Sequence, residues 1–154
     1  TRQAQIITWM PNVDLDCYDP PCLQSLFYRI LEDEEGTWHL NCNVRFRSND
    51  AWGASFMNMF GVVHFNREVI AEKIKAITKK KVELGRMNWH ADSYHIYGKD
   101  LNDFKKRFVN NLDRPFESRV YNFFDPMIQE IYQEAEKKVK QKIKNYDSRK
   151  QMRH

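Results

Sequence analysis

The feature that most restricts the fold of this chain is a strict alternation of apolar and polar side chains between residues 38 and 47. The apolar set is Trp38, Leu40, Cys42, Val44 and Phe46, and the polar set is His39, Asn41, Asn43, Arg45 and Arg47. A period of two residues is typical of a β-strand with one buried face. A second apolar segment, residues 23–31, precedes it across an acidic turn at residues 33–36. We therefore expect these two segments to pair as an antiparallel hairpin.

After Asp50 the apolar residues recur every three or four positions. This spacing predicts a long helix with one apolar side, formed by Phe56, Met59, Phe60, Val63, Ile70, Ile74 and Ile77. The lysines at positions 79–81 favour its C-terminal end, where a helix dipole attracts positive charge.

The remaining segments complete a layered domain. A short strand is expected at residues 5–9, followed by a polar loop, and a strand at 87–97 follows a break at Gly85. Helices are expected at 101–112 and after Pro126. Strands that precede helices indicate an α/β (α+β) fold, in which a mixed β-sheet is layered with helices.

Composition narrows the class of protein. The chain has 154 residues, of which 42% are apolar, so it suits one domain, residues 1–154, with a buried core. No apolar run approaches the roughly 18 to 20 residues of a membrane-spanning helix, which argues against an integral membrane protein. Three cysteines, Cys17, Cys22 and Cys42, lack the spacing of a zinc ribbon and the even number of a disulfide scaffold. We expect no metal site and a reducing, cytoplasmic location.

The C-terminal segment is basic, with eight basic and three acidic residues between positions 134 and 154. Such a segment can bind nucleic acid or anionic lipid. It can also be the solvated side of a helix, and its apolar residues recur every three or four positions: Ile128, Ile131, Tyr132, Ala135, Val139, Ile143 and Tyr146. This pattern favours a basic amphipathic helix at residues 127–154 with one buried face, and makes nucleic acid the less favoured partner.

Cys22 is the most informative single residue. It follows Pro20 and Pro21, which hold the backbone rigid, and a nearby arginine would stabilise its thiolate. A lone cysteine is more often a small buried apolar residue than a nucleophile. That reading fits Cys42, which lies in the alternating strand, while Cys17 lies in the polar loop.

Two further clusters carry polar groups. Arg47-Ser48-Asn49-Asp50 lies between the expected strand and helix, where it could bind an anion such as a phosphate or simply cap the helix. His95 and Tyr97 alternate along the next expected strand and therefore lie on one side of it. The alternative for this pair is an ordinary half-buried strand edge.

Taken in order, these clusters resemble the thymidylate synthase family, which includes pyrimidine hydroxymethylases. The matching residues are Pro20-Pro21-Cys22, Arg47-Ser48-Asn49-Asp50, Asn58, and the segment from Asp92 to Tyr97. The resemblance extends from about Arg2 to Phe104, and four matches in one order are more specific than any one of them.

The resemblance implies folate-dependent methylation of deoxyuridylate (dUMP) to thymidylate (dTMP), with 5,10-methylenetetrahydrofolate as co-substrate. Cys22 would be the nucleophile that adds to C6 of the uracil ring. Arg47 would support that thiolate and bind the phosphate with Ser48, while Asp50 would help to orient the base. Asn58 would hydrogen-bond the O4 and N3–H edge of uracil.

Two more roles follow from the resemblance. His95 and Tyr97 would hold the ribose hydroxyl. Arg2 matches an arginine that reaches the phosphate of a neighbouring subunit, which implies a homodimer.

The chain also departs from the family pattern. Relatives have an N-terminal portion with a catalytic glutamate and folate-contacting tryptophans, so we expect the parent protein to be longer or the missing half to be supplied separately. Gln3, Phe46, Gly53 and Tyr94 differ from the usual residues or spacing. The lysine-rich C-terminus replaces the short apolar tail that closes over folate.

That altered tail leaves the product open. Hydride transfer to the methylene intermediate yields thymidylate, whereas water yields 5-hydroxymethyldeoxyuridylate, so a dUMP hydroxymethylase is the alternative to a synthase. Two other classes stay open: a module that binds single-stranded nucleic acid through its basic end and aromatic residues, and an inactive paralogue.

Overall fold

The computed structural model describes residues 3–151, with side chains up to Tyr146 in the last helix. The chain divides into two compact units, residues 1–107 and 108–154. The first contains all of the strands found in the described residues and four of the α-helices, α1 to α4; the second contains α5.

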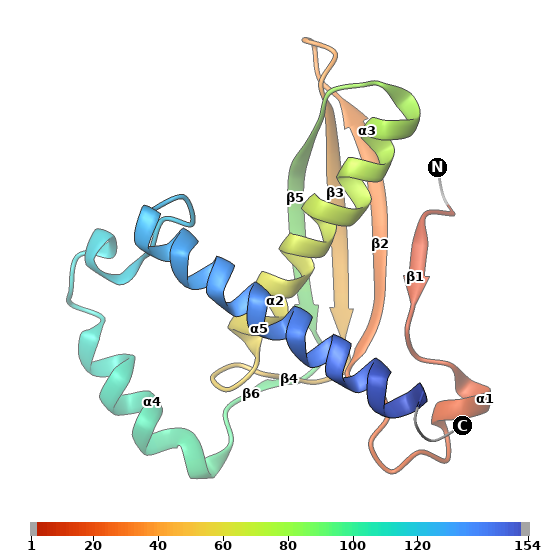
Figure 1. Cartoon of the computed structure of the whole chain (residues 1–154). Coiled ribbons are helices and arrows are strands. Elements are labelled where there is room, and N and C mark those ends of the chain that lie inside the picture. The colour runs from red at the N-terminus through yellow and green to blue at the C-terminus, as the bar shows by residue number, and fades with distance from the viewer. Residues whose placement is uncertain (1–2, 152–154) are drawn as a thin grey trace. The chain divides into compact units, whose positions relative to one another are not determined.

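The first unit is built on a four-stranded mixed sheet in the order β1-β2-β3-β5 (Figure 1). Its strands are β1 (Gln5–Ile7), β2 (Leu23–Glu32), β3 (Trp38–Phe46) and β5 (Val82–Ala91). The predicted hairpin is confirmed, since β2 and β3 are antiparallel with Tyr28 opposite Cys42. Strand β5 runs parallel to β3, which makes the sheet mixed, and the α/β fold class is confirmed.

A second, two-stranded sheet lies where β3 and β5 end. Strand β4 (Asn49–Asp50) pairs in parallel with β6 (Tyr94–His95). Between the two sheets, the Ser93 N–H donates to the Arg47 carbonyl at 3.2 Å. The strand predicted for residues 87–97 is therefore two strands, and the one predicted for 5–9 ends at Ile7.

One face of the large sheet is covered by the predicted long helix, which runs across β2, β3 and β5 (Figure 1). It consists of α2 (Ser55–His64), a π-helical segment (Phe65–Ala71) and α3 (Glu72–Thr78), and it ends at Lys79, whose φ is 59°. The predicted apolar side was partly wrong. Phe56 and Ile77 are 73% and 72% exposed; they lie in the first turn of α2 and the last turn of α3, at the two ends of the helix layer.

The core lies between this helix and the sheet. Its buried apolar residues are Leu26, Tyr28, Leu40, Cys42, Val44, Phe46, Ala71 and Val82. Val62, Ile70 and Ile74 pack against it from the helix. The prediction that Cys42 is a buried apolar residue is confirmed, since it is 2% exposed.

Gly85 was wrongly predicted as a break between elements, because it lies inside β5. Here Gly85 and Arg86 oppose the single residue Asn41 of β3, and the register shifts. The Asn41 side chain occupies the space beside the glycine: its Oδ1 accepts from the Arg86 N–H at 2.9 Å. A Cβ at position 85 would lie 2.8 Å from that oxygen. Glycine therefore permits a bulge rather than a break.

The remaining helices are short. The loop after β1 contains the unpredicted helix α1 (Pro11–Asp14), and α4 (Leu101–Arg107) covers only part of the helix predicted at 101–112. The rest of that segment is a 3₁₀ turn at Val109–Asn111.

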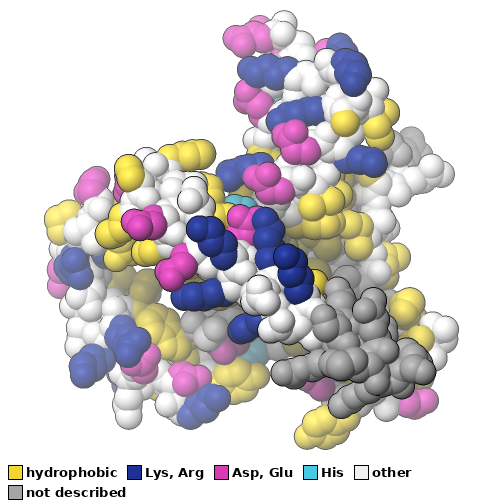
Figure 2. Space-filling view, viewed as in Figure 1, with side chains coloured by type: hydrophobic (Ala, Val, Ile, Leu, Met, Phe, Trp, Pro, Cys, Tyr) yellow, Lys and Arg dark blue, Asp and Glu magenta, His cyan; other side chains and the backbone are white. Residues whose placement is uncertain are grey.

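In the second unit, α5 (Pro126–Gln151) is the predicted terminal helix. Its basic and acidic side chains are interspersed (Figure 2), and Lys138 and Lys140 pair with Glu134 and Glu136. Ile131, Val139 and Ile143 of its apolar face are more than half exposed, so burial of that face stays a prediction. Within the described residues, no helix has the length and apolar character needed to cross a membrane.

Candidate active site

Cys22 lies at one end of the larger sheet, directly before Leu23, the first residue of β2. Its side chain is exposed, as is that of Cys17 in the preceding loop. The thiol is therefore accessible to a substrate, in contrast to the buried thiol of Cys42.

Arg47, which follows the end of β3, binds the loop that carries Cys22. Its Nη2 donates to the Pro20 carbonyl at 2.6 Å and its Nε donates to the Pro21 carbonyl at 3.2 Å. Asp19 lies 3.8 Å from the same guanidinium, and the Arg47 backbone N–H donates to the Cys22 carbonyl at 2.9 Å. These bonds join the nucleophile's loop to the end of the central strand.

Cys22 and Asn58 line the same pocket, whose volume is about 530 Å³. Asn58 comes from α2, and the apolar wall includes Phe46 at the end of β3 and Val62 one turn further along α2. Thr8 completes the wall, and its hydroxyl donates to the Leu23 carbonyl. The pocket thus combines a thiol and a carboxamide in mostly apolar surroundings.

Asn58 has a partner that the sequence pattern does not indicate. Its Nδ2 donates to Oδ1 of Asn49 at 3.3 Å, and Asn49 is 3% exposed. Asn49 is the unspecified position in the Arg-Ser-x-Asp pattern, so no residue-type signal identified it. Thr8 was also missed, because a threonine near a strand end is too common to mark a site.

Asp50 closes the turn that precedes α2. Its Oδ1 accepts from the backbone N–H groups of Trp52 at 3.0 Å and Gly53 at 2.9 Å, as is typical of an aspartate in a turn. The helix-capping alternative for the cluster was wrong, because α2 begins at Ser55 and its N-cap, Ala54, makes no side-chain bond. A further role of Asp50 toward a nucleotide stays a prediction, as does that of Ser48, which is half-buried beside it.

His95 and Tyr97 contact each other, but the prediction that both lie in one strand was wrong, because β6 ends at His95. Their ring centroids are 4.9 Å apart with the rings nearly perpendicular, at 87°. His95 lies opposite Asp50 in the small sheet, and its Nδ1 lies 3.3 Å from the Ser93 hydroxyl. The structure therefore groups this pair with Asp50, whereas Cys22 and Asn58 share the neighbouring pocket. Arg2 lies outside the described residues.

Two shifted pKa values belong to the core and not to this site. Burial raises the pKa of the Cys42 thiol. Burial, followed by the interaction with Cys42, raises the pKa of Tyr28, whose hydroxyl donates to Asn66 at 2.8 Å. Both groups stay protonated near neutrality, so neither supplies a nucleophile or a base.

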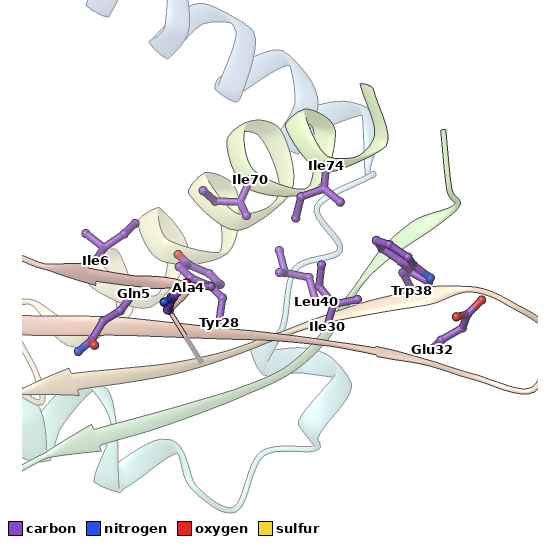
Figure 3. A pocket seen from close by; sticks show the side chains of 11 residues that line it. Ala4, Gln5, Ile6, Tyr28, Ile30, Glu32, Trp38, Leu40, Ile70 and Ile74 are labelled. Atoms are coloured by element: carbon purple, nitrogen blue, oxygen red, sulfur yellow. The ribbon is translucent and has the colours of Figure 1, made fainter. Parts of the chain in front are cut away.

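A pocket of about 600 Å³ lies elsewhere, between the sheet and the helix layer (Figure 3). Ile30, Trp38, Leu40, Ile70 and Ile74 form its apolar lining. Its larger volume does not make it the candidate site, because its described lining contains no thiol, histidine or arginine.

Comparison with known proteins finds archaeal relatives. A protein of Methanocaldococcus jannaschii is 34% identical over 73% of this chain and 48% of its own length. A protein of Methanothermobacter marburgensis is 28% identical over 71% of this chain and 44% of its own. Both carry the name "Putative thymidylate synthase". They support a distant link to the thymidylate synthase family.

The chain spans about half the length of the curated relatives it matches. No protein-family model matches it, and no solved structure matches it.

Proposed function

We propose that this chain carries the nucleotide-binding and nucleophile-bearing part of a thymidylate synthase, which methylates dUMP to dTMP. The observation that carries the proposal is that Cys22 and Asn58 line one pocket. An accessible thiol and a carboxamide are the two groups needed to attack a uracil ring and to recognise its edge. The distant archaeal relatives support the same activity.

The proposed reaction begins with the Cys22 thiolate. Its sulfur forms a bond to C6 of the uracil ring, and the electrons of the C5–C6 double bond move toward C4 and O4, which makes C5 nucleophilic. When bound, methylenetetrahydrofolate supplies the one-carbon unit that bonds to C5 and the hydride that reduces this unit to a methyl group. C5 loses its proton before the hydride is transferred, and elimination of the Cys22 thiolate then releases dTMP. The described residues do not mark a folate site, so we assign none of them to it.

Asn58 would position the base in this scheme. Its amide can donate to O4 of uracil and accept from N3–H, and the donated bond favours the negative charge that develops on O4. Arg47 would hold the loop of Cys22 through its bonds to Pro20 and Pro21, while its other terminal nitrogen and the Ser48 hydroxyl bind the phosphate.

The remaining roles are proposed from the resemblance. His95 and Tyr97 would hold the ribose hydroxyl, and Asp50 would help to orient the base from the turn before α2. Arg2 of a second copy would bind the phosphate, so that the active protein is a homodimer.

The test is adduct formation with 5-fluoro-dUMP and methylenetetrahydrofolate, using the complete gene product. Fluorine at C5 blocks the loss of a proton, so a synthase retains the covalent complex, which is visible as added mass. We expect the adduct in the unaltered protein and in Cys17→Ala, a control at the other exposed thiol of the same loop. Cys22→Ala should form none.

Failure of the complete protein to form an adduct would contradict the proposal. If the adduct forms, product analysis with dUMP distinguishes a synthase from a hydroxymethylase, because a synthase releases dTMP and a hydroxymethylase releases 5-hydroxymethyl-dUMP. Binding to an oligonucleotide that falls steeply with salt, without binding of dUMP, would instead identify a nucleic-acid-binding module.

A further inference from the structure

We propose that Asn49 sets the orientation of the Asn58 carboxamide and thereby selects uracil over cytosine. This inference rests on the proposed function, because it concerns the same pocket. It makes Asn49 a positioning residue, which acts on the substrate through Asn58.

Asn49 is buried, and the small sheet fixes its backbone. It lies in β4, its backbone N–H donates to the Ser93 carbonyl at 2.9 Å, and its side chain is 3% exposed. The Asn49 Oδ1 accepts the bond from Asn58 Nδ2. The Asn49 Nδ2 is buried and has no hydrogen-bond partner in the part of the chain that the structure describes. The bond to Asn58 is therefore the one polar contact of this side chain within that part, which leaves Asn49 without a competing partner.

The need for such a residue follows from the chemistry of the carboxamide. An asparagine presents a donor on one side and an acceptor on the other, and a rotation of 180° exchanges them. With the ring held at C6 and at the phosphate, one orientation matches O4 and N3–H of uracil. The reversed orientation matches the N4 amino group and N3 of cytosine. An asparagine alone could thus recognise either base.

Asn49 removes this ambiguity as long as it presents its Oδ1 to Asn58, which is the arrangement in the structure. Its Oδ1 can accept from the Asn58 NH₂ but repels the Asn58 carbonyl oxygen. One Asn58 N–H is then held by Asn49, the other is left for O4, and Oδ1 is left for N3–H. The buried acceptor thus maintains the orientation that fits uracil, before any nucleotide binds.

The experiment compares the dissociation constants of dUMP and dCMP in the complete gene product, measured by calorimetry. Asn49→Leu has nearly the same shape but no acceptor. We expect it to reduce the preference for dUMP about tenfold, the effect of losing roughly one hydrogen bond, mainly through tighter binding of dCMP. Asn49→Asp, measured at about pH 8 so that the carboxylate only accepts, should retain the preference of the unaltered protein.

A matched control is available on the other face of the sheet. Asn88 Nδ2 donates to Asn43 Oδ1 at 2.7 Å, which is a second amide pair, and Asn43 is exposed. Asn43→Leu should leave the preference unchanged. An Asn49→Leu protein that is folded by circular dichroism and keeps the full preference would overturn the role of Asn49. Absence of dUMP binding by the unaltered protein would instead overturn the proposed function.

If Asn49→Leu does not fold, the proposal is tested by NMR in the unaltered protein. The side-chain NH₂ resonances of Asn58 are identified by their loss in Asn58→Ala. One of its two protons should exchange slowly with solvent because it is bonded to a buried oxygen. Rapid exchange of both protons, or protection of the Asn49 NH₂ in their place, would overturn the proposal.

Discussion

At the scale of single residues, Arg47 has two proposed tasks that use different donors of one guanidinium. Its guanidinium already donates to two backbone carbonyls next to Cys22, and its side chain is 37% exposed. A planar fork can bind two acceptors of fixed geometry at once, which a lysine ammonium cannot do in the same way. We therefore expect that the effect of Arg47 on the position of the Cys22 loop can be measured separately from its effect on phosphate binding.

This separation gives a prediction for Arg47→Lys, which keeps the charge and loses the fork. We expect the rate of adduct formation at Cys22 to fall about tenfold, since about 1.5 kcal/mol is the low end for bonds from a charged donor, and this side chain is partly exposed. The dissociation constant of dUMP should change much less. Stopped-flow mixing with 5-fluoro-dUMP measures the first quantity, and calorimetry with dUMP measures the second.

Arg45→Lys is the matched control, because Arg45 is 61% exposed and pairs with Asp92 away from the loop. It should change neither quantity. A weaker dUMP affinity in Arg47→Lys with an unchanged rate of adduct formation would mean that Arg47 acts on the phosphate alone.

The candidate site could be predicted from the sequence only where residue type and order carry the signal. Cys22 and Asn58 were found in this way, and the structure places them in one pocket. The bonds of Arg47 to Pro20 and Pro21 could not be predicted, because they depend on where the end of β3 meets a distant loop. Asn49 could not be found either, since its role depends on burial beside Asn58 and not on its residue type.

At the scale of elements, the bulge in β5 shows why a glycine was misinterpreted. Glycine is common both at breaks and at close approaches of two strands, and sequence spacing does not separate these cases. The Asn41 side chain makes the difference: its Nδ2 donates to the His39 carbonyl at 3.1 Å, and its Oδ1 accepts from Arg86. Moving this amide away from a Cβ at position 85 would break at least one of these two hydrogen bonds.

We therefore expect Gly85→Ala to lower the free energy of unfolding by about 1–3 kcal/mol, as overpacking does. Gly61→Ala is the control, because no atom lies within 4 Å of a Cβ built at this position of α2. It should leave stability unchanged or raise it by up to about 1 kcal/mol, since alanine is the better helix former. Urea denaturation of the complete protein measures both.

A double-mutant cycle tests the stated cause. In an Asn41→Ala background the space beside Gly85 is open, so Gly85→Ala should cost clearly less there. Equal costs in the two backgrounds would show that the Asn41 side chain is not the reason for the glycine.

At the scale of the whole molecule, the layered α/β arrangement followed from periodicity, because the change from a two-residue to a three- or four-residue period marks where β3 ends and the helix layer begins. The surroundings of α5 could not be predicted in this way. An amphipathic pattern indicates that a helix has an apolar face but does not say what covers it, and Ile131 and Ile143 are exposed in the described chain. The proposed homodimer belongs to the same scale, because it concerns contacts beyond one chain.

Subunit complementation tests the dimer. If Arg2 of one copy binds the phosphate in the site of the other, Arg2→Ala and Cys22→Ala should each be nearly inactive. In a mixed dimer, the site that keeps Cys22 receives Arg2 from its partner and is complete. Random reassociation places about half of the subunits in mixed dimers with one complete site of two, so activity should return to about a quarter of that of the unaltered protein.

The matched control mixes Cys22→Ala with Arg47→Ala. Arg47 binds the loop of Cys22 within its own chain, so neither site of that mixed dimer contains both residues, and activity should not return. Recovery in this control as well would mean that Arg47 also acts across the dimer. No recovery with Arg2→Ala, under conditions in which sedimentation shows mixed dimers, would place Arg2 in the site of its own subunit and remove the present reason for expecting a dimeric site.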